Sequence, residues 1–209
     1  MEQISGTIDS VIDGKRVKTK PLEQITLNYP GAGKGTALTV GHPEPITLHK
    51  SLGVKGRSSN LVLVKPSTEP FMRGIANDID AGRLTLMEAA EEATKPSTVR
   101  TIKSALLSIT AKGPGKLPPF FALLTGTKDG VRKAVGCHAT TLPAGMAGAT
   151  SIPAAIAVDM LLRNPAEPGV HAPEDIIDAE EMLDRLRDHC TVRTNDVEEM
   201  MPLSEMVLD

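Results

Sequence analysis

The sequence predicts an α+β fold, with a mixed, largely antiparallel sheet covered on one face by helices. Short β-rich segments fill the first third, helical patterns fill the middle, and a second hairpin pattern precedes the last helices. This order differs from the regular β-α-β alternation that builds a parallel sheet. We therefore expect antiparallel pairing to dominate the sheet.

The predicted strands are organised around tight turns. Asp13-Gly14 is a dipeptide that favours a two-residue hairpin, and it separates β-rich segments 6–12 and 15–19. Asp129-Gly130 likewise predicts a hairpin turn, between segments 120–125 and 131–139. The remaining predicted strands cover 24–29, 36–40, 60–64, 120–125 and 131–139.

Capping signals and apolar spacing predict the helices. Thr85 with Glu88 forms a capping box, which opens a helix running through Ala93. Ser97 can cap the next helix, over 98–111, in which Val99, Ile102, Leu106 and Ile109 fall at helical spacing. Further helices are expected over 70–81, over 153–162 and from Asp178, which forms a cap with Glu181, to about Asp188.

Composition limits the classes of function. The net charge is −3 without a basic stripe, and the four aromatic residues are too few to stack bases, so nucleic-acid binding is disfavoured. With so few aromatic residues, we expect an aliphatic core. Cys137 and Cys190 lie far apart, and their spacing with the five histidines does not indicate a metal site. These features fit a reducing compartment.

The organisation predicted along the chain is one domain over 1–193, followed by an acidic, Met-rich tail over 194–209 that is expected to be flexible. No apolar run is expected to be long enough for a bilayer, and no signal peptide pattern opens the sequence. We therefore expect a cytoplasmic protein.

The segment Tyr29–Thr36 is similar to the phosphate loop of nucleotide kinases. A phosphate loop needs a glycine where this chain has Asn28, and it needs a following helix whose amides point at the phosphates. A strand pattern follows Thr36 instead. A flexible hairpin loop is the favoured interpretation, and a kinase that binds ATP through this segment is the less favoured one.

Residues 40–48 follow a predicted strand and contain two prolines around Glu44, which predict a rigid turn. Such a turn can present His42 and Glu44 at the end of the sheet, where a titrating group can act as acid or base. The alternative is a rigid connector whose polar side chains are merely exposed.

Residues 145–153 form a run of small residues in which Gly148 leaves room for a ligand to approach the backbone. Thr150 or Ser151 can cap a helix that has Pro153 in its first turn. The free amides there would favour a carboxylate or phosphate. The alternative is that the small residues only permit close packing of a helix on a sheet.

Several short motifs, in one order, resemble the saccharopine dehydrogenase-like family. They are Gly-His-Pro-Glu-Pro-Ile-Thr-Leu at 41–48, the segment 118–130, the small-residue run 145–153, and segment 169–178. The resemblance spans most of the chain, to about Cys190. It implies the C-terminal α+β domain of that family, which supplies the substrate pocket and the dimer interface.

The resemblance also implies the chemistry. In the family, NAD or NADP is bound by a Rossmann domain, which this chain lacks, and the reactions are oxidations at the carbon–nitrogen bonds of amino acids or polyamines. It implies a homodimer that is inactive without the cofactor domain, with catalytic roles for His42 and Glu44 and substrate contacts from Gly148, Thr150 and Ser151.

One departure concerns the substrate-anchoring cation. Where the family has a basic pair after Thr-Leu, this chain has His49-Lys50, which makes Lys50, Lys55 and Arg57 the candidates. A non-catalytic binding or assembly module of the same architecture is the alternative function.

Overall fold

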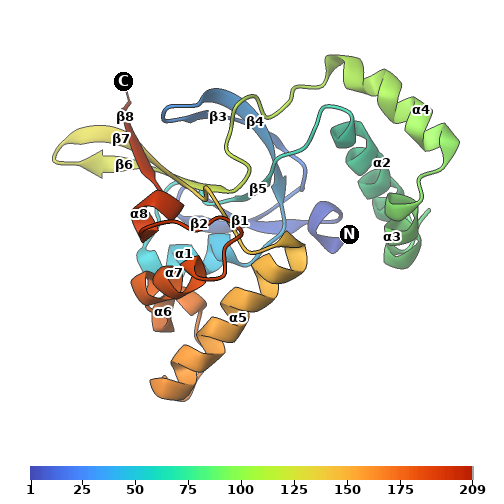
Figure 1. The fold of residues 1–209 in the computed structure, drawn as a ribbon. Coiled ribbons are helices and arrows are strands. Elements are labelled where there is room, and N and C mark those ends of the chain that lie inside the picture. The colour runs from blue at the N-terminus through green and yellow to red at the C-terminus, as the bar shows by residue number, and fades with distance from the viewer. Residues whose placement is uncertain (209) are drawn as a thin grey trace. The chain divides into compact units, whose positions relative to one another are not determined.

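The computed structural model describes residues 1–208, which form two compact units (Figure 1). The first comprises residues 1–28 and 33–117, and the second comprises residues 29–32 with the chain from Pro118 onward. The α+β prediction is confirmed, with the strands divided among three small sheets. The expectation of one domain over 1–193 stays a prediction, and the main division between the two compact units falls after Leu117.

The first unit contains four α-helices, two 3₁₀ helices and two of the sheets. Its elements are η1 (Glu2–Ile4), β1 (Ile8–Ile12), β2 (Lys15–Thr19), β3 (Gln24–Tyr29), β4 (Gly33–Val40), α1 (Glu44–Leu52), β5 (Asn60–Val62), α2 (Thr68–Asp80), α3 (Leu86–Thr94), α4 (Thr98–Leu107) and η2 (Ser108–Thr110). One sheet pairs β1 with β2, and the other has the order β3-β4-β5.

The predicted turn at Asp13-Gly14 forms, and β1 pairs with β2 antiparallel with Ile12 opposite Lys15. Asp13 and Gly14 have φ angles of 50° and 68°. Two consecutive positive φ angles match the right-handed twist of the flanking strands, which is why this dipeptide predicts a tight hairpin.

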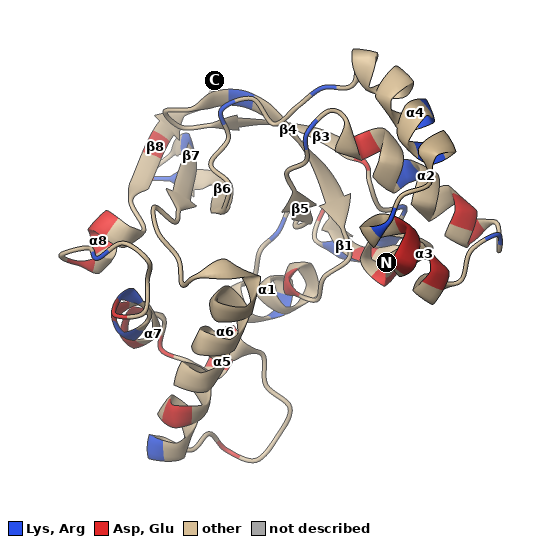
Figure 2. Ribbon diagram, turned by 45° about the vertical axis from the view of Figure 1, so that its right-hand side comes forward, with Lys and Arg blue, Asp and Glu red and all other residues tan. Residues whose placement is uncertain are grey.

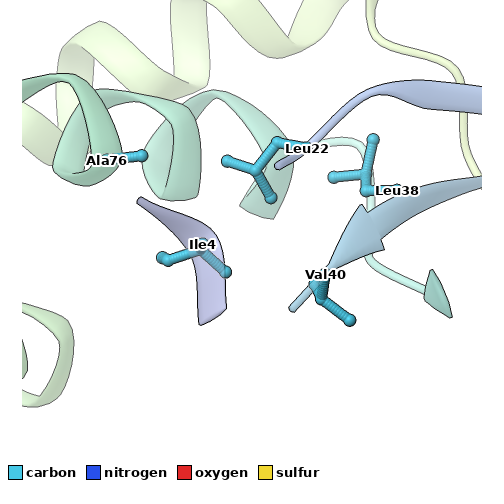
Figure 3. Packing of buried hydrophobic residues seen from close by; sticks show 5 residues of the cluster. All are labelled: Ile4, Leu22, Leu38, Val40 and Ala76. Carbon is cyan, nitrogen blue, oxygen red and sulfur yellow. The ribbon is translucent and has the colours of Figure 1, made fainter. Parts of the chain in front are cut away.

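The core of the first unit is aliphatic, as the scarcity of aromatic residues predicts. Figure 3 shows the side chains that η1, β4, α2 and the β2–β3 connection contribute to it. Val62, Val64 and Met72 pack against this cluster. The buried members are Ile4, Leu22, Leu38, Val40 and Ala76.

The segment after β4 is helical, which corrects the rigid turn expected over 40–48. Helix α1 begins at Glu44, with Pro43 at its N-cap and Pro45 in its first turn. Proline is tolerated there because the first amides of a helix have no intrahelical partner. Gly53, with a φ of 63°, ends the helix in the left-handed conformation.

The predicted caps of α3 and α4 are present. Thr85 and Glu88 form both hydrogen bonds of a capping box, and the Ser97 hydroxyl accepts from the Arg100 amide. Helix α4 gives way to a 3₁₀ turn at Ser108, so the helix predicted over 98–111 is shorter than expected.

The second unit contains one sheet of order β6-β7-β8 and several helices. Its β6–β7 hairpin turns at Asp129-Gly130, as predicted, and α7 is capped by the Asp178 carboxylate, which accepts from the Glu181 amide. The elements are β6 (Phe121–Lys128), β7 (Val131–His138), α5 (Gly145–Arg163), α6 (Pro173–Ile176), α7 (Ala179–Arg187), α8 (Val197–Met200) and β8 (Leu203–Val207).

Tyr29 belongs to the second unit and is almost fully buried. Its ring packs edge-on against Phe121 at 5.3 Å between centroids, and its hydroxyl lies 3.2 Å from His138 Nδ1. A Cβ on Gly136 would lie 2.5 Å from the Tyr29 ring. Glycine at this strand position therefore makes room for the aromatic side chain.

The tail expected to be flexible over 194–209 is ordered as far as it is described. Strand β8 pairs antiparallel with β7, and Asp196 caps the short helix α8. Met200 is 1% exposed. Strand β8 forms because β7, which pairs with β6 along one edge, has a second edge free for pairing. The composition of residues 194–209 alone does not reveal this distant partner strand.

Helix α5 begins at Gly145 and is nineteen residues long, so Pro153 lies inside it rather than in its first turn. Its length and composition would allow it to cross a bilayer, which corrects the expectation that no apolar segment is long enough. The small residues 145–152 extend the apolar segment through Leu162. Ile156 and Met160 pack against Leu186, and most of the remaining helix surface is exposed.

Candidate functional site

A cavity of about 430 Å³ lies where β4 leads into α1 in the first unit. We call it the His42 cavity. It is lined by η1, β1, Arg16 of β2 and the β4–α1 connection. The lining side chains used below are Asp9, Arg16, His42, Ile46 and Thr47.

Gly41 allows the wall of this cavity to close. Its amide donates to the Gln3 carbonyl at 2.8 Å. A Cβ at this position would lie 2.6 Å from Ile8 Cγ2. Any side chain there would push the β4–α1 connection away from β1, so glycine permits a close approach of two backbones.

His42 and Glu44, both expected at the end of the sheet, lie close together. His42 Nδ1 is 3.6 Å from a Glu44 carboxylate oxygen, and the same oxygen accepts from the Asn60 amide at 2.8 Å. The His42 side chain is 38% exposed, so it is open to a ligand in the cavity. A carboxylate held by a second donor can orient an imidazole that exchanges protons with a ligand.

Charged groups on the β1–β2 hairpin, Asp9 and Arg16, also line the cavity. The Asp9 carboxylate accepts from Arg16 Nε at 3.0 Å and from Lys18 Nζ at 2.9 Å. These hydrogen bonds, from Arg16 first and then Lys18, lower the pKa of Asp9 to about 2. The cavity therefore presents an ionised carboxylate and a guanidinium side by side.

The sequence reading missed Asp9 and Arg16, although a signal for them was present. The Asp13-Gly14 turn fixes the hairpin register, which sets Asp9 opposite Lys18 and Val11 opposite Arg16. Opposite charges on paired strands stabilise each other across the ladder. Counting residues outward from the Asp13-Gly14 turn would have predicted that Asp9 lies close to Arg16 and Lys18 on the paired strand.

Lys50 and Arg57, the expected substrate-anchoring cations, do not line the His42 cavity. Lys50 is exposed near the end of α1. Arg57 forms an ion pair with Glu23, and its Nε donates to the Ser59 hydroxyl at 3.3 Å. Arg16 of β2 lines the cavity instead.

Gly148, Thr150 and Ser151 lie inside α5 in the second unit. The expectation that Thr150 or Ser151 caps a helix is wrong. The first-turn amides that lack a partner belong to residues 145–148, because the glycines and alanines of this run are helical here. Both hydroxyl side chains are exposed on the helix surface.

The glycine-rich segment 31–35 joins two strands, as the hairpin interpretation predicts. The turn closes with a hydrogen bond from the Ala32 amide to the Tyr29 carbonyl at 3.1 Å, and β4 follows from Gly33. A dinucleotide or phosphate loop needs a helix at this point, whose amides meet the phosphates. The segment therefore does not fit NAD(P) or ATP.

The thiols and histidines of residues 1–208 do not form a metal cluster with carboxylates. Burial raises the pKa of the Cys137 and Cys190 thiols. Cys137 Sγ contacts the Met201 carbonyl at 3.6 Å. Both thiols therefore stay protonated, as expected of cysteines that serve packing.

Neither the known protein-family models nor the curated proteins include a match to this chain.

Proposed function

We propose that this chain is the substrate-binding and dimerisation domain of an NAD(P)-dependent oxidoreductase, similar to saccharopine dehydrogenase, that acts on a carbon–nitrogen bond of an amino acid or polyamine. The supporting observation is that His42 lines a cavity while its Nδ1 lies 3.6 Å from the Glu44 carboxylate. The pair belongs to segment 41–48, the motif on which the resemblance depends.

The charges of the cavity suit a zwitterionic ligand. An amino acid carries an ammonium and a carboxylate, and the wall offers the Asp9 carboxylate and the Arg16 guanidinium. His42 would hold or accept the proton of the substrate nitrogen, and Glu44 would keep the imidazole oriented. Ile46 gives the cavity an apolar side against which an aliphatic chain can pack.

The cofactor is proposed to be held by a Rossmann domain outside this chain, because segment 31–35 does not fit it. NAD or NADP would supply hydride transfer when bound. The contribution of this chain is to bind and orient the substrate and to handle its proton. The proposal includes a cytoplasmic location.

An exposed apolar stripe on α4 supports the dimerisation role. Val99, Ile102 and Leu106 share one face of α4 and are 56% to 78% exposed, and Ile109 of the following η2 turn is 81% exposed. Exposed apolar patches on a helix mark surfaces that are covered in an assembly. The same observation favours the second candidate, a non-catalytic assembly module of this architecture.

The test of the substrate role is a thermal-shift panel with saccharopine, lysine, 2-oxoglutarate, spermidine, NADH, NADPH and ATP. A ligand that binds only the folded state raises the Tm as its concentration exceeds Kd. We expect a shift with an amino-acid or polyamine ligand that His42→Ala abolishes and the exposed-histidine control His189→Ala retains. A shift with ATP alone, or one that His42→Ala leaves unchanged, contradicts the proposal.

The two candidate functions separate in an oligomerisation experiment. Analytical ultracentrifugation of Ile102→Asp should show a monomer where the unchanged chain is a dimer, with Thr101→Asp, at an exposed position on another face of α4, as the matched control. A dimer that resists Ile102→Asp removes α4 from the interface. A dimer that binds none of the panel ligands favours the assembly module.

A further inference from the structure

A second cavity of the first unit, of about 470 Å³, is lined by residues of α2 and α4 and by residues 110–112. We call it the α2–α4 cleft. None of its lining residues belongs to the His42 cavity, and none was predicted as a site residue. Basic segments on α2 and α4 are visible in Figure 2.

The cleft is positively charged in a chain of net charge −3. Two acidic side chains, Glu69 and Asp78, line it together with five basic ones, which leaves an excess of three positive charges. The basic residues are Arg73, Arg83, Arg100, Lys103 and Lys112. Such a concave cluster of one sign concentrates ligands of the opposite sign.

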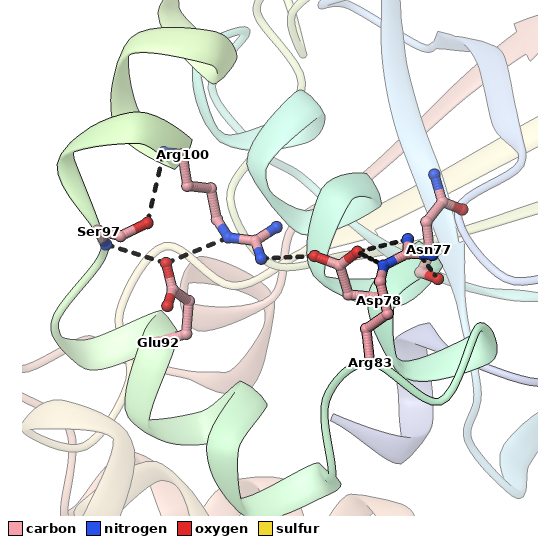
Figure 4. Close-up of polar contacts among 6 residues, drawn as sticks. All are labelled: Asn77, Asp78, Arg83, Glu92, Ser97 and Arg100. Carbon is pink, nitrogen blue, oxygen red and sulfur yellow. Dashed lines mark hydrogen bonds and ion pairs between the residues drawn. The ribbon is translucent and has the colours of Figure 1, made fainter.

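The arginines are held in place by the acidic groups. Arg100 Nη2 donates to Asp78 at 2.6 Å and its Nε donates to Glu92 at 3.2 Å, while Arg83 Nε donates to the other Asp78 oxygen at 2.7 Å (Figure 4). The Arg100 side chain is 18% exposed. This network fixes the guanidiniums as part of the cleft wall.

The lysines differ from the arginines. Over residues 1–208, neither Lys103 nor Lys112 has a carboxylate within ion-pair distance. One lies on α4 and the other follows η2, and both line the same cleft. Two ammonium groups without acidic partners in one concavity can bind a ligand that carries two acidic groups.

The lining of the cleft also includes apolar residues. Pro70, Leu107 and Ala111 contribute apolar surface beside the charges. A Cβ on Gly74 would lie 3.0 Å from Arg100 Nη1, so the glycine leaves space for the guanidinium. Small-molecule sites combine an apolar lining with a few placed polar groups in this way.

We propose that the α2–α4 cleft binds a small polyanion with two or more acidic groups, paired to Lys103 and Lys112 beside the fixed Arg100 guanidinium. This inference is independent of the proposed function, because the His42 cavity shares no residue with the cleft.

Isothermal titration calorimetry of the full chain at low ionic strength tests the proposal, with citrate and inorganic pyrophosphate as probes. We expect binding of at least one probe, weakened about three- to tenfold by Lys103→Met or Lys112→Met, because each removes one charge-assisted pair. Lys116→Met, an exposed lysine of the same connection outside the cleft, should bind like the unchanged chain. His42→Ala should also leave this binding intact.

The two probes identify the acidic group. Binding of citrate alone indicates a polycarboxylate, binding of pyrophosphate alone indicates a phosphorylated ligand, and binding of both supports the shared class. Circular dichroism checks that the lysine variants fold. No binding of either probe, or equal affinities for Lys103→Met, Lys112→Met and Lys116→Met, overturns the proposal.

Discussion

The two cavities of the first unit differ in how far apart their lining residues lie in the sequence. The His42 cavity depends on one contiguous motif, segment 41–48, which meets the nearby hairpin of β1 and β2. The α2–α4 cleft gathers residues from Gln24 to Lys112, which no short motif unites. A site concentrated in one segment leaves a pattern in the sequence, while a site assembled by helix packing does not.

Their electrostatics differ in the same way. Asp9, Arg16 and Lys18 belong to one exposed hairpin, so their ion pairs are local. Arg100 connects α4 with Asp78 of α2 and Glu92 of α3. Half-buried pairs between separate elements contribute more to stability than exposed pairs within one hairpin, because they are less screened by solvent. Substitutions in the two cavities should therefore differ in their effects.

The largest expected effect comes from Gly35→Ala. A Cβ there would lie 2.0 Å from the Pro114 carbonyl oxygen and 2.5 Å from Leu117 Cγ. The backbone of the 113–117 segment, which follows Lys112 of the cleft, would have to shift, and we expect a loss of about 3 kcal/mol in the free energy of unfolding. Urea denaturation measures it. Gly126→Ala, where no atom lies within 4 Å, is the control; equal losses in both variants would refute the steric argument.

Arg100→Met comes next. It leaves Asp78 and Glu92 without their shared partner in a half-buried position. We expect a loss of about 2 kcal/mol in the free energy of unfolding, because carboxylates that lose a partner keep their desolvation cost. Arg83→Met, whose side chain is 62% exposed, should cost at most about 0.5 kcal/mol in the same urea experiment. A larger loss of unfolding free energy for Arg83→Met than for Arg100→Met would contradict the assignment of Arg100 as the main stabilising partner of Asp78 and Glu92.

Gly41→Ala should have a smaller effect than Gly35→Ala. Its Cβ would contact Ile8 Cγ2 at 2.6 Å, and a side-chain atom can move more easily than a backbone carbonyl. We expect about 1 kcal/mol of destabilisation, measured by thermal melting, together with lost ligand shifts at the His42 cavity. Polyanion binding to the α2–α4 cleft should persist. Loss of both binding activities would mean that the cavities are not independent.

The smallest expected effect is a difference in acid sensitivity. Hydrogen bonds from Arg100, and then from Arg83, lower the pKa of Asp78 below its ordinary value of 3.8. A carboxyl with a lowered folded-state pKa stabilises the fold above pH 3.8, and that stability is lost as the pH falls further. Arg100→Met should therefore lose less stability than the unchanged chain between pH 5 and 2, measured by urea midpoints. Parallel curves for the two proteins would contradict this assignment.

Helix α4 shows what the spacing of apolar residues can predict and what it cannot. The spacing of Val99, Ile102 and Leu106 predicted a helix, and the helix forms. Its polar side, with Ser104 buried and Arg100 half-buried, packs on α2, while the apolar positions are exposed. A pattern defines two faces of a helix, but the neighbouring elements decide which face is covered.

The candidate site shows the same limit. His42 and Glu44 lie two residues apart after a strand, so their meeting followed from local geometry. The position of Thr150 depended on where α5 begins, and Gly145 starts it well before Pro153. Proline is common in the first turn but is also tolerated inside a helix at some cost, so the expected start was wrong.

The sequence by itself determined the local structure of this protein: the Asp13-Gly14 and Asp129-Gly130 turns, the caps at Thr85, Ser97 and Asp178, and the aliphatic composition of the core. These features depend on interactions between residues a few positions apart. Only the tertiary structure decided the division into two units, the pairing of β8 with β7, and the positively charged α2–α4 cleft. These depend on contacts between distant segments, whose partners are chosen by packing of the whole chain rather than by any local pattern.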